Sequence, residues 1–226
     1  DVATGREVWR LGGKPRVYRI AFSPDGKRFL TAGGSDPVVS LWDVATGSEV
    51  RQFSGRGGAY DAVFSADGRY VGAASGDAAR VWDAETGSVV QEFKADANWR
   101  FIQGVQFSPD GKSVVLTANG KGGVRLHDVA TGKQLHEYPA AYTGPASSIT
   151  VATFSPDGKL LLVSETVNYA TTLLLWNVAT REEVSRFKLP AAYSGNLSFS
   201  PDGKFFLAAD RMWEVATRRE VKRFEG

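Results

Sequence analysis

The sequence predicts an all-β protein, a β-propeller whose blades are four-stranded antiparallel sheets arranged around an axis. Three observations predict this fold. Two short motifs alternate along the whole chain at one period, both have the residues of tight turns, and the segments between them are short and strand-like. A repeat of about 40–45 residues that holds four strands is the usual size of a propeller blade.

The first motif is Phe-Ser-Pro-Asp-Gly or a close variant, and its copies are 42 to 47 residues apart. Proline fixes φ at the first turn position, aspartate bonds to nearby backbone, and glycine takes the left-handed conformation that closes a hairpin. We therefore expect an antiparallel turn at each copy, for example between strands 17–22 and 28–32. The five copies begin at Phe22, Phe64, Phe107, Phe154 and Phe199.

The second motif is Asp-Val-Ala-Thr-Gly or a variant, and it interleaves with the first. Its Asp/Thr cap and closing glycine predict a second turn in each period, for example between strands 38–42 and 49–53. One period thus holds four short strands and two tight turns, which is one antiparallel sheet. The six copies begin at Asp1, Asp43, Asp83, Asp128, Asn177 and Glu214.

The second strand of each period is apolar without alternation, as in 114–116, 160–163 and 205–207. A strand that is apolar on both sides must be covered on both faces, and sheets stacked around an axis provide this cover. The outer strands differ, because their apolar residues, such as Val50 and Phe53, lie three apart. This spacing favours a β-bulge or a strong edge twist over strict alternation; a short helix is the poorer alternative.

The composition limits the classes of partner. Hydrophobic residues make up 42% and charged residues 23%, and 27 basic against 25 acidic side chains leave a net charge of +2. A chain without a concentrated basic surplus is not expected to bind nucleic acid. It has no cysteine, which excludes disulfides and thiolate sites and fits a reducing compartment, so we expect a cytoplasmic protein. No apolar run is long enough to span a bilayer, so we expect no membrane partner.

Counting strands predicts a single propeller domain, or part of a larger propeller, over 1–226, with five complete blades and one extra N-terminal outer strand. The extra strand, 6–11, lies within 1–11. Three arrangements remain open: a fragment of a larger propeller, a closed five-bladed ring, and an open arc completed by a second copy, which predicts self-association. The first residue, Asp1, favours a start inside a longer or trimmed chain. The blades are expected at approximately 12–53, 54–93, 94–138, 139–187 and 188–226.

A Trp-Asp pair ends the third strand in two of the repeats, at Trp42-Asp43 and Trp82-Asp83. In three others the pair is altered to His127-Asp128, Trp176-Asn177 and Trp213-Glu214. With the 40-residue period, these pairs make the chain similar to the WD-repeat β-propeller family, and its motifs resemble those of bacterial members. The resemblance covers nearly the whole chain and implies a propeller that binds other proteins.

The chain departs from the WD-repeat pattern in two ways. The family's Gly-His pair is missing, so the hydrogen-bonded tetrad built on that histidine cannot form and the blades are expected to depend on apolar packing. Arg181 and Arg218 replace the closing glycine, so those two turns must adopt another geometry or carry strain. Residues 1–9 also resemble a repeat of quinone-cofactor propellers, a likeness confined to this segment. The Gly-His pair of the WD-repeat family would fall at the positions that hold Gly13, Gly55, Asn98, Pro145 and Pro190 in this chain.

The sequence offers no catalytic constellation. His127 takes the place of a structural tryptophan, and His136 lies in an outer strand, so the two form no recognisable metal pair. The motif serines have no nearby histidine to act as a base, and the repeated aspartates are turn formers. We therefore expect no enzyme, no cofactor and no metal site.

The resemblance implies that loops between blades, and between second and third strands, crowd one rim of the propeller. In this chain those loops vary in length and carry residue types that dominate binding interfaces. The expected function is a non-catalytic scaffold or sensor module that binds a protein or peptide on this rim. The alternative for Tyr18 and Tyr60 is that each only covers its own blade. The predicted rim residues are Arg16, Tyr18, Arg56, Tyr60, Trp99, Arg100, Tyr142, Tyr169 and Tyr193.

Two other functions remain open. One is a purely structural array of blades that assembles with copies of itself. The other, less favoured because it needs a polar cluster that converges on the central channel, is a propeller enzyme or cofactor binder.

Overall fold

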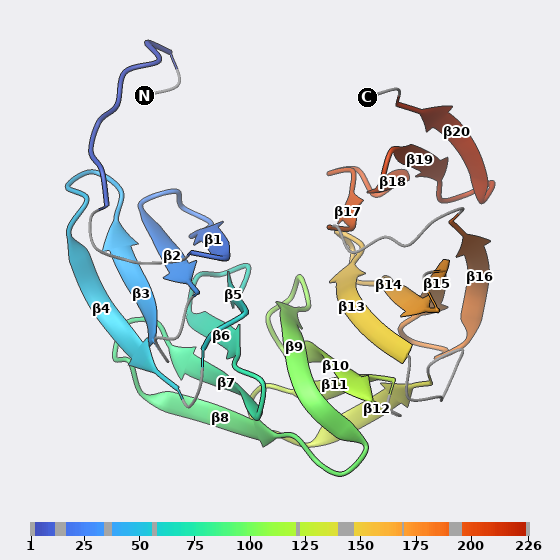
Figure 1. Ribbon diagram of the computed structural model, residues 1–226, viewed down its shortest axis with the longest axis horizontal. Helices are drawn as coiled ribbons and strands as arrows, with labels where there is room; N and C mark the ends of the chain where they lie inside the picture. The colour runs from blue at the N-terminus through green and yellow to red at the C-terminus, as the bar shows by residue number, and fades with distance from the viewer. Residues whose placement is uncertain are drawn as a thin grey trace.

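The computed structural model describes residues 3–11, 17–33, 38–55, 58–120, 123–139, 147–168, 170–189 and 196–224. These residues form twenty strands and no helix, arranged as five four-stranded antiparallel blades. Figure 1 shows the blades side by side along an open arc, with the two chain ends on opposite sides of the opening. The predicted all-β fold with five complete blades is confirmed.

Each blade is a meander in which consecutive strands pair, and the first strand lies on the inner side of the arc (Figure 1). Blades 3 and 4 are also joined by one backbone pair, Asn119 with Ser148. Blade 1 comprises β1 (Arg19–Phe22), β2 (Arg28–Ala32), β3 (Val38–Asp43) and β4 (Glu49–Ser54). Blade 2 comprises β5 (Asp61–Phe64), β6 (Tyr70–Ala74), β7 (Ala78–Asp83) and β8 (Val89–Lys94). Blade 3 comprises β9 (Trp99–Phe107), β10 (Ser113–Gly120), β11 (Val124–Asp128) and β12 (Gln134–Tyr138). Blade 4 comprises β13 (Ser147–Phe154), β14 (Leu160–Val167), β15 (Ala170–Asn177) and β16 (Glu183–Lys188). Blade 5 comprises β17 (Ser198–Phe199), β18 (Phe205–Ala208), β19 (Arg211–Glu214) and β20 (Arg219–Arg223).

The two motifs form the turns that their residues predict. In the first motif the Ser23 hydroxyl donates to Asp25 Oδ1 at 2.6 Å and accepts from the Arg28 N–H at 2.9 Å. In the second, the backbone N–H and the hydroxyl of Thr46 both donate to Asp43 Oδ1. Arg181 and Arg218 keep the left-handed conformation of the glycine that they replace, with φ of 65° and 61°. The two turns therefore do not adopt another geometry; they keep the glycine conformation and carry the strain that a side chain has there.

Every outer strand contains the predicted β-bulge. In blade 1, Leu41 pairs with Arg51 and Trp42 pairs with Glu49, so Val50 is the extra residue. The same register shift recurs where β8, β12, β16 and β20 pair with their third strands. The bulge places one residue of each outer strand out of register, which explains the three-residue spacing.

The hydrophobic core is a series of layers between neighbouring blades. Among the described residues there are four buried clusters, and each combines side chains from two successive blades. The apolar second strands are therefore covered on both faces, as expected. In blade 1 a hydrogen bond adds to this packing, because Trp42 Nε1 donates to Thr31 Oγ1 at 2.9 Å. Apolar packing alone, the expectation from the missing tetrad, is thus wrong for this blade.

The N-terminal segment corrects one expectation. Residues 3–11 are described, and they form no strand, although 6–11 were predicted as an extra outer strand. An outer strand needs a third strand to pair with, and the described residues offer none beside blade 1 (Figure 1). The segment is held instead by Trp9, which stacks on Phe29 at 5.3 Å and donates from Nε1 to the Val44 carbonyl at 2.9 Å. The closed five-bladed ring is not the observed arrangement.

Candidate binding site on the inner face of the arc

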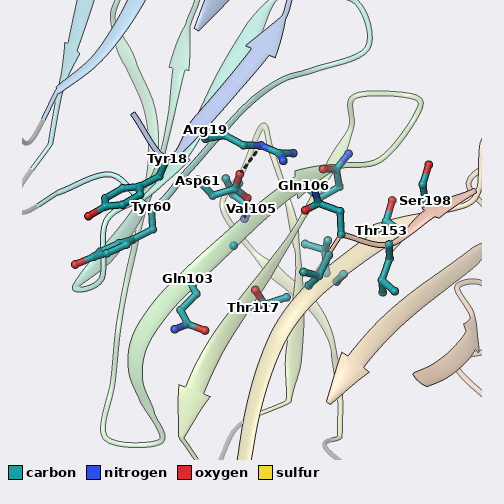
Figure 2. A pocket seen from close by; sticks show the side chains of 16 residues that line it. Tyr18, Arg19, Tyr60, Asp61, Gln103, Val105, Gln106, Thr117, Thr153 and Ser198 are labelled. Carbon is teal, nitrogen blue, oxygen red and sulfur yellow. Dashed lines mark hydrogen bonds and ion pairs between the residues drawn. The ribbon is translucent and has the colours of Figure 1, made fainter. Parts of the chain in front are cut away.

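The inner strands of all five blades line a pocket of about 580 Å³ on the concave side of the arc. Figure 2 shows its side chains, which come mainly from β1, β5, β9, β13 and the segment that begins at Asn196. Most of them are polar. The polar lining residues described below are Tyr18, Arg19, Tyr60, Asp61, Gln103, Gln106, Thr117 and Asn196.

Two tyrosines stand side by side at one edge of the pocket (Figure 2). The backbone N–H groups of Tyr18 and Tyr60 donate to Ala32 and Ala74, which extends the inner-strand pairing by one residue in each blade. This places the two rings parallel, with centroids 6.5 Å apart and an interplanar angle of 15°. Phe101 continues the row from blade 3, with its ring edge-on to Tyr60 at 5.1 Å. Both tyrosine rings remain about half-exposed.

An ion pair lies behind the tyrosines. Arg19 Nε is 3.2 Å from Asp61 Oδ1, and Asp61 Oδ2 accepts from the Val105 N–H at 3.2 Å. One carboxylate therefore links the inner strands of blades 1, 2 and 3. Desolvation raises the pKa of Asp61, against the opposing effects of the Arg19 charge and the two backbone N–H groups that it contacts.

Thr117 adds a polar group to the floor of the pocket. Its hydroxyl oxygen is buried and has no hydrogen-bond partner among the described residues. Gly104 makes this approach possible, because a Cβ at that position would lie 2.5 Å from Thr117 Oγ1. The pocket thus combines aromatic faces, a fixed and internally neutral ion pair, and hydroxyl and amide groups that can donate or accept hydrogen bonds.

The histidines lie elsewhere. His127 packs against Phe93 with ring centroids 4.6 Å apart, and its Nδ1 is 3.3 Å from the Gly132 carbonyl. Burial lowers the pKa of His127. His136 is partly exposed and lies edge-on to Tyr138. Within the part of the chain that the structure describes, no group of three or more histidine or acidic side chains could hold a metal ion.

The structure brings two of the predicted rim residues, Tyr18 and Tyr60, to the same pocket. The prediction that Trp99 is available on the rim is wrong, because its ring is buried in the core of blades 2 and 3 beneath the Arg125 guanidinium, 4.2 Å away. The backbone of Arg100 lies in β9, and its side chain is outside the described part. Five other predicted residues also lie outside the described residues: Arg16, Arg56, Tyr142, Tyr169 and Tyr193.

The ion pair between Arg19 and Asp61 was not predicted from the sequence, although a signal was present. Tyr18-Arg19 and Tyr60-Asp61 occupy the same place in successive repeats, just before the inner strand reaches its motif phenylalanine. Opposite charges at one repeat position are expected to meet where neighbouring blades converge on the axis. Thr117 and Gly104 carried no comparable signal, because their approach depends on the register of β9 with β10.

The described residues contain no helix that is both long and apolar enough to cross a membrane. A family model described as outer membrane protein assembly factor BamB matches residues 1–218. A protein of Deinococcus radiodurans described as an uncharacterized WD repeat-containing protein is 32% identical over 112 residues, which is 44% of this chain and 40% of that protein. The sequence predicted a likeness to quinone-cofactor (PQQ-type) propeller repeats at residues 1–9 alone. The family match shows that this likeness extends over nearly all of the chain.

Proposed function

This chain belongs to the PQQ-like β-propeller family whose model is described as outer membrane protein assembly factor BamB, and from this premise we propose that it is a non-catalytic interaction module. Its partner is a protein or peptide segment, held against the tyrosine-lined pocket. The description of the family model names an assembly factor, which acts on other proteins, and this supports a protein partner.

The observation that carries the proposal is the stacked pair of half-exposed tyrosines at the edge of the pocket. Tyrosine offers a large, rigid contact area and a hydroxyl at a low cost in conformational entropy, so it is enriched among the residues that dominate binding. The two parallel rings, with Phe101 edge-on to Tyr60, form a preorganised aromatic edge of the pocket. An extended peptide can place an apolar or aromatic side chain against this edge.

The remaining groups suit the main chain of such a peptide. Gln103, Gln106 and Asn196 place amide groups along the pocket, and an extended peptide presents N–H and C=O groups that amides can pair. The pocket is built on strands rather than on loops, so its groups are held in place before binding, which lowers the entropy cost of association.

A quinone cofactor that carries carboxylates would need cationic side chains facing it. Arg19 is the single cation among the described residues that line the pocket, and Asp61 neutralises it at 3.2 Å. These residues do not fit such a cofactor, and the proposed function involves none.

A peptide library displayed on phage tests the proposal. We expect the chain to select peptides with a shared motif, and the double variant Tyr18→Ala/Tyr60→Ala to bind the selected peptides at least about tenfold more weakly, as for loss of a dominant contact. Val89→Ala is the matched control, because this exposed side chain lies on the outer strand of blade 2. Selected peptides that bind the double variant as well as the wild type, or a selection that enriches no motif, would refute this site.

A further inference from the structure

Two buried polar atoms of the pocket have no hydrogen-bond partner among the described residues. One is the hydroxyl oxygen of Thr117, a residue that is 2% exposed, and the other is Arg19 Nε. Arg19 Nε lies 3.2 Å from Asp61 Oδ1, which is close enough for an ion pair but lacks the alignment of a hydrogen bond. Figure 2 shows the Thr117 hydroxyl pointing toward the part of the pocket where Arg19 and Asp61 lie. A buried polar group without a partner destabilises the fold, so both atoms need an explanation.

The repeat shows that the fold does not require a hydroxyl at position 117. The same place, ten residues after the start of the first motif, holds Ala32 in blade 1 and Ala74 in blade 2, and both are buried. In blade 4 it holds Ser164, whose hydroxyl donates to the Val151 carbonyl at 3.5 Å. Blade 3 therefore buries a hydroxyl that its own folding does not use.

The residue that pairs with Thr117 also departs from the repeat. In the inner strands of blades 1, 2 and 4 its place is taken by Arg19, Asp61 and Val151, whereas blade 3 has Gly104. A Cβ at Gly104 would lie 2.5 Å from Thr117 Oγ1 and 3.8 Å from Asp61 Oδ2. The hydroxyl and the carboxylate thus approach the same point from two blades, and any side chain at position 104 would separate them.

The charges of the pocket favour an uncharged polar group in the bound molecule. Arg19 and Asp61 are the only charged side chains among the described residues that line the pocket. A carboxylate would face Asp61, whose pKa is already raised by burial, and a cation would face Arg19. The guanidinium offers N–H donors, and the oxygens of Asp61 and Thr117 are acceptors. A carboxamide matches this set, because it is uncharged and carries an acceptor oxygen beside an NH₂ donor.

We propose, on the basis of the peptide-binding function above, that the pocket recognises a carboxamide side chain of the peptide, that of asparagine or glutamine. Its oxygen accepts from the Arg19 guanidinium, and its NH₂ group donates to the Thr117 hydroxyl. Binding thereby supplies partners to the two groups that lack them. Tyr18 and Tyr60 directly precede Arg19 and Asp61 in the chain, so the peptide residue at the aromatic edge is a close neighbour of the carboxamide.

Exchange of the carboxamide for a carboxylate in the peptide tests the charge requirement. We expect asparagine or glutamine in the motif that the phage selection enriches. A synthetic peptide with that motif is compared with a second peptide in which this residue is replaced by the acid of the same shape, aspartate or glutamate. In isothermal titration calorimetry the acidic peptide should bind at least about tenfold more weakly, because it brings a second negative charge to Asp61.

The outcomes separate this proposal from the function on which it rests. An enriched motif without asparagine or glutamine, or equal affinity of the two peptides, would overturn carboxamide recognition and leave the peptide-binding function in place. A selection that enriches no motif would overturn both.

Removal of the Thr117 hydroxyl tests the same contact from the side of the protein. Thr117→Val should bind the synthetic peptide about fivefold more weakly, as for the loss of one hydrogen bond. Its thermal unfolding midpoint without peptide should be unchanged or higher, because the hydroxyl has no partner in the free chain. Thr117→Ser keeps the hydroxyl and should bind as the wild type does.

Thr31→Val is the matched control, because it removes a buried hydroxyl that has a partner. Thr31 accepts from Trp42 Nε1 at 2.9 Å and is not among the described residues that line the pocket. This variant should therefore lower the unfolding midpoint and leave the affinity for the peptide unchanged. A Thr117→Val variant that keeps full affinity, or that loses stability as Thr31→Val does, would overturn the proposal.

Discussion

Phe53 in blade 1 and Phe224 in blade 5 occupy the same position of the repeat, yet one is buried and the other is exposed. Phe53 is the last but one residue of β4 and Phe224 directly follows β20, and each comes after the same β-bulge. The difference is that blade 2 lies against Phe53, while no described blade lies against Phe224 (Figure 1). In this fold the burial of a residue depends on the neighbouring blade more than on its own blade.

The strongest test of this comparison truncates both phenylalanines. Phe53→Ala should lower the free energy of unfolding by about 3–5 kcal/mol, because it opens a cavity in a packed layer. Phe224→Ala should lower it by about 0.5 kcal/mol or less, as is usual for an exposed position. Denaturant unfolding monitored by tryptophan fluorescence measures both, at a concentration where the chain is monomeric. Equal losses would mean that blade 5 is covered in solution.

Trp9 tests the same dependence in blade 1, because its ring covers part of the face that no described blade covers. Trp9→Ala should lower the stability of blade 1 by about 1–2 kcal/mol, through loss of its stacking on Phe29 and its hydrogen bond to Val44. Amide hydrogen exchange should show faster exchange in β2 and β3, with β14 and β15 as the internal reference. Unchanged exchange in β2 and β3 would show that Trp9 does not stabilise blade 1.

The closing turns of the second motif provide a smaller test. Arg181 holds a left-handed conformation that glycine adopts without strain, so Arg181→Gly should raise the free energy of unfolding by about 1 kcal/mol. Gly87 has the same conformation in blade 2, and a Cβ there would lie 2.8 Å from the Arg51 guanidinium. Gly87→Ala should therefore destabilise the chain in the same unfolding assay. A loss of stability in Arg181→Gly would show that the arginine side chain contributes more than its backbone strain costs.

The smallest expected effect concerns Asp61 at the inner end of the first two junctions. Because burial raises its folded-state pKa above the ordinary value near 3.8, Asp61 lowers stability as the pH rises from that value through the raised one. Asp61→Asn cannot ionise. The unfolding midpoint of the variant minus that of the wild type should therefore increase across this pH interval and level off above it. A difference that falls with pH would mean that Arg19 outweighs the cost of burying the carboxylate.

The sequence predicted the regular part of the molecule well, because that part depends on local chemistry. Turn residues at a fixed period placed all five hairpin motifs, and the spacing of Val50 and Phe53 predicted the bulge. For the candidate site it was less informative. It identified Tyr18 and Tyr60 from their residue type and their place in the loops between blades, and it misplaced Trp99, whose burial results from contacts with the preceding blade.

Local residue preferences therefore account for the blade: its four strands, its turns, its bulge and its two apolar faces. The packing of the blades sets which faces are covered, how residues 3–11 pack through Trp9 without forming a strand, and where Arg19 meets Asp61. The physical reason is the range of the interactions. Turn and strand preferences act within a few residues, whereas burial and ion pairing depend on how successive blades stack and curve around the axis.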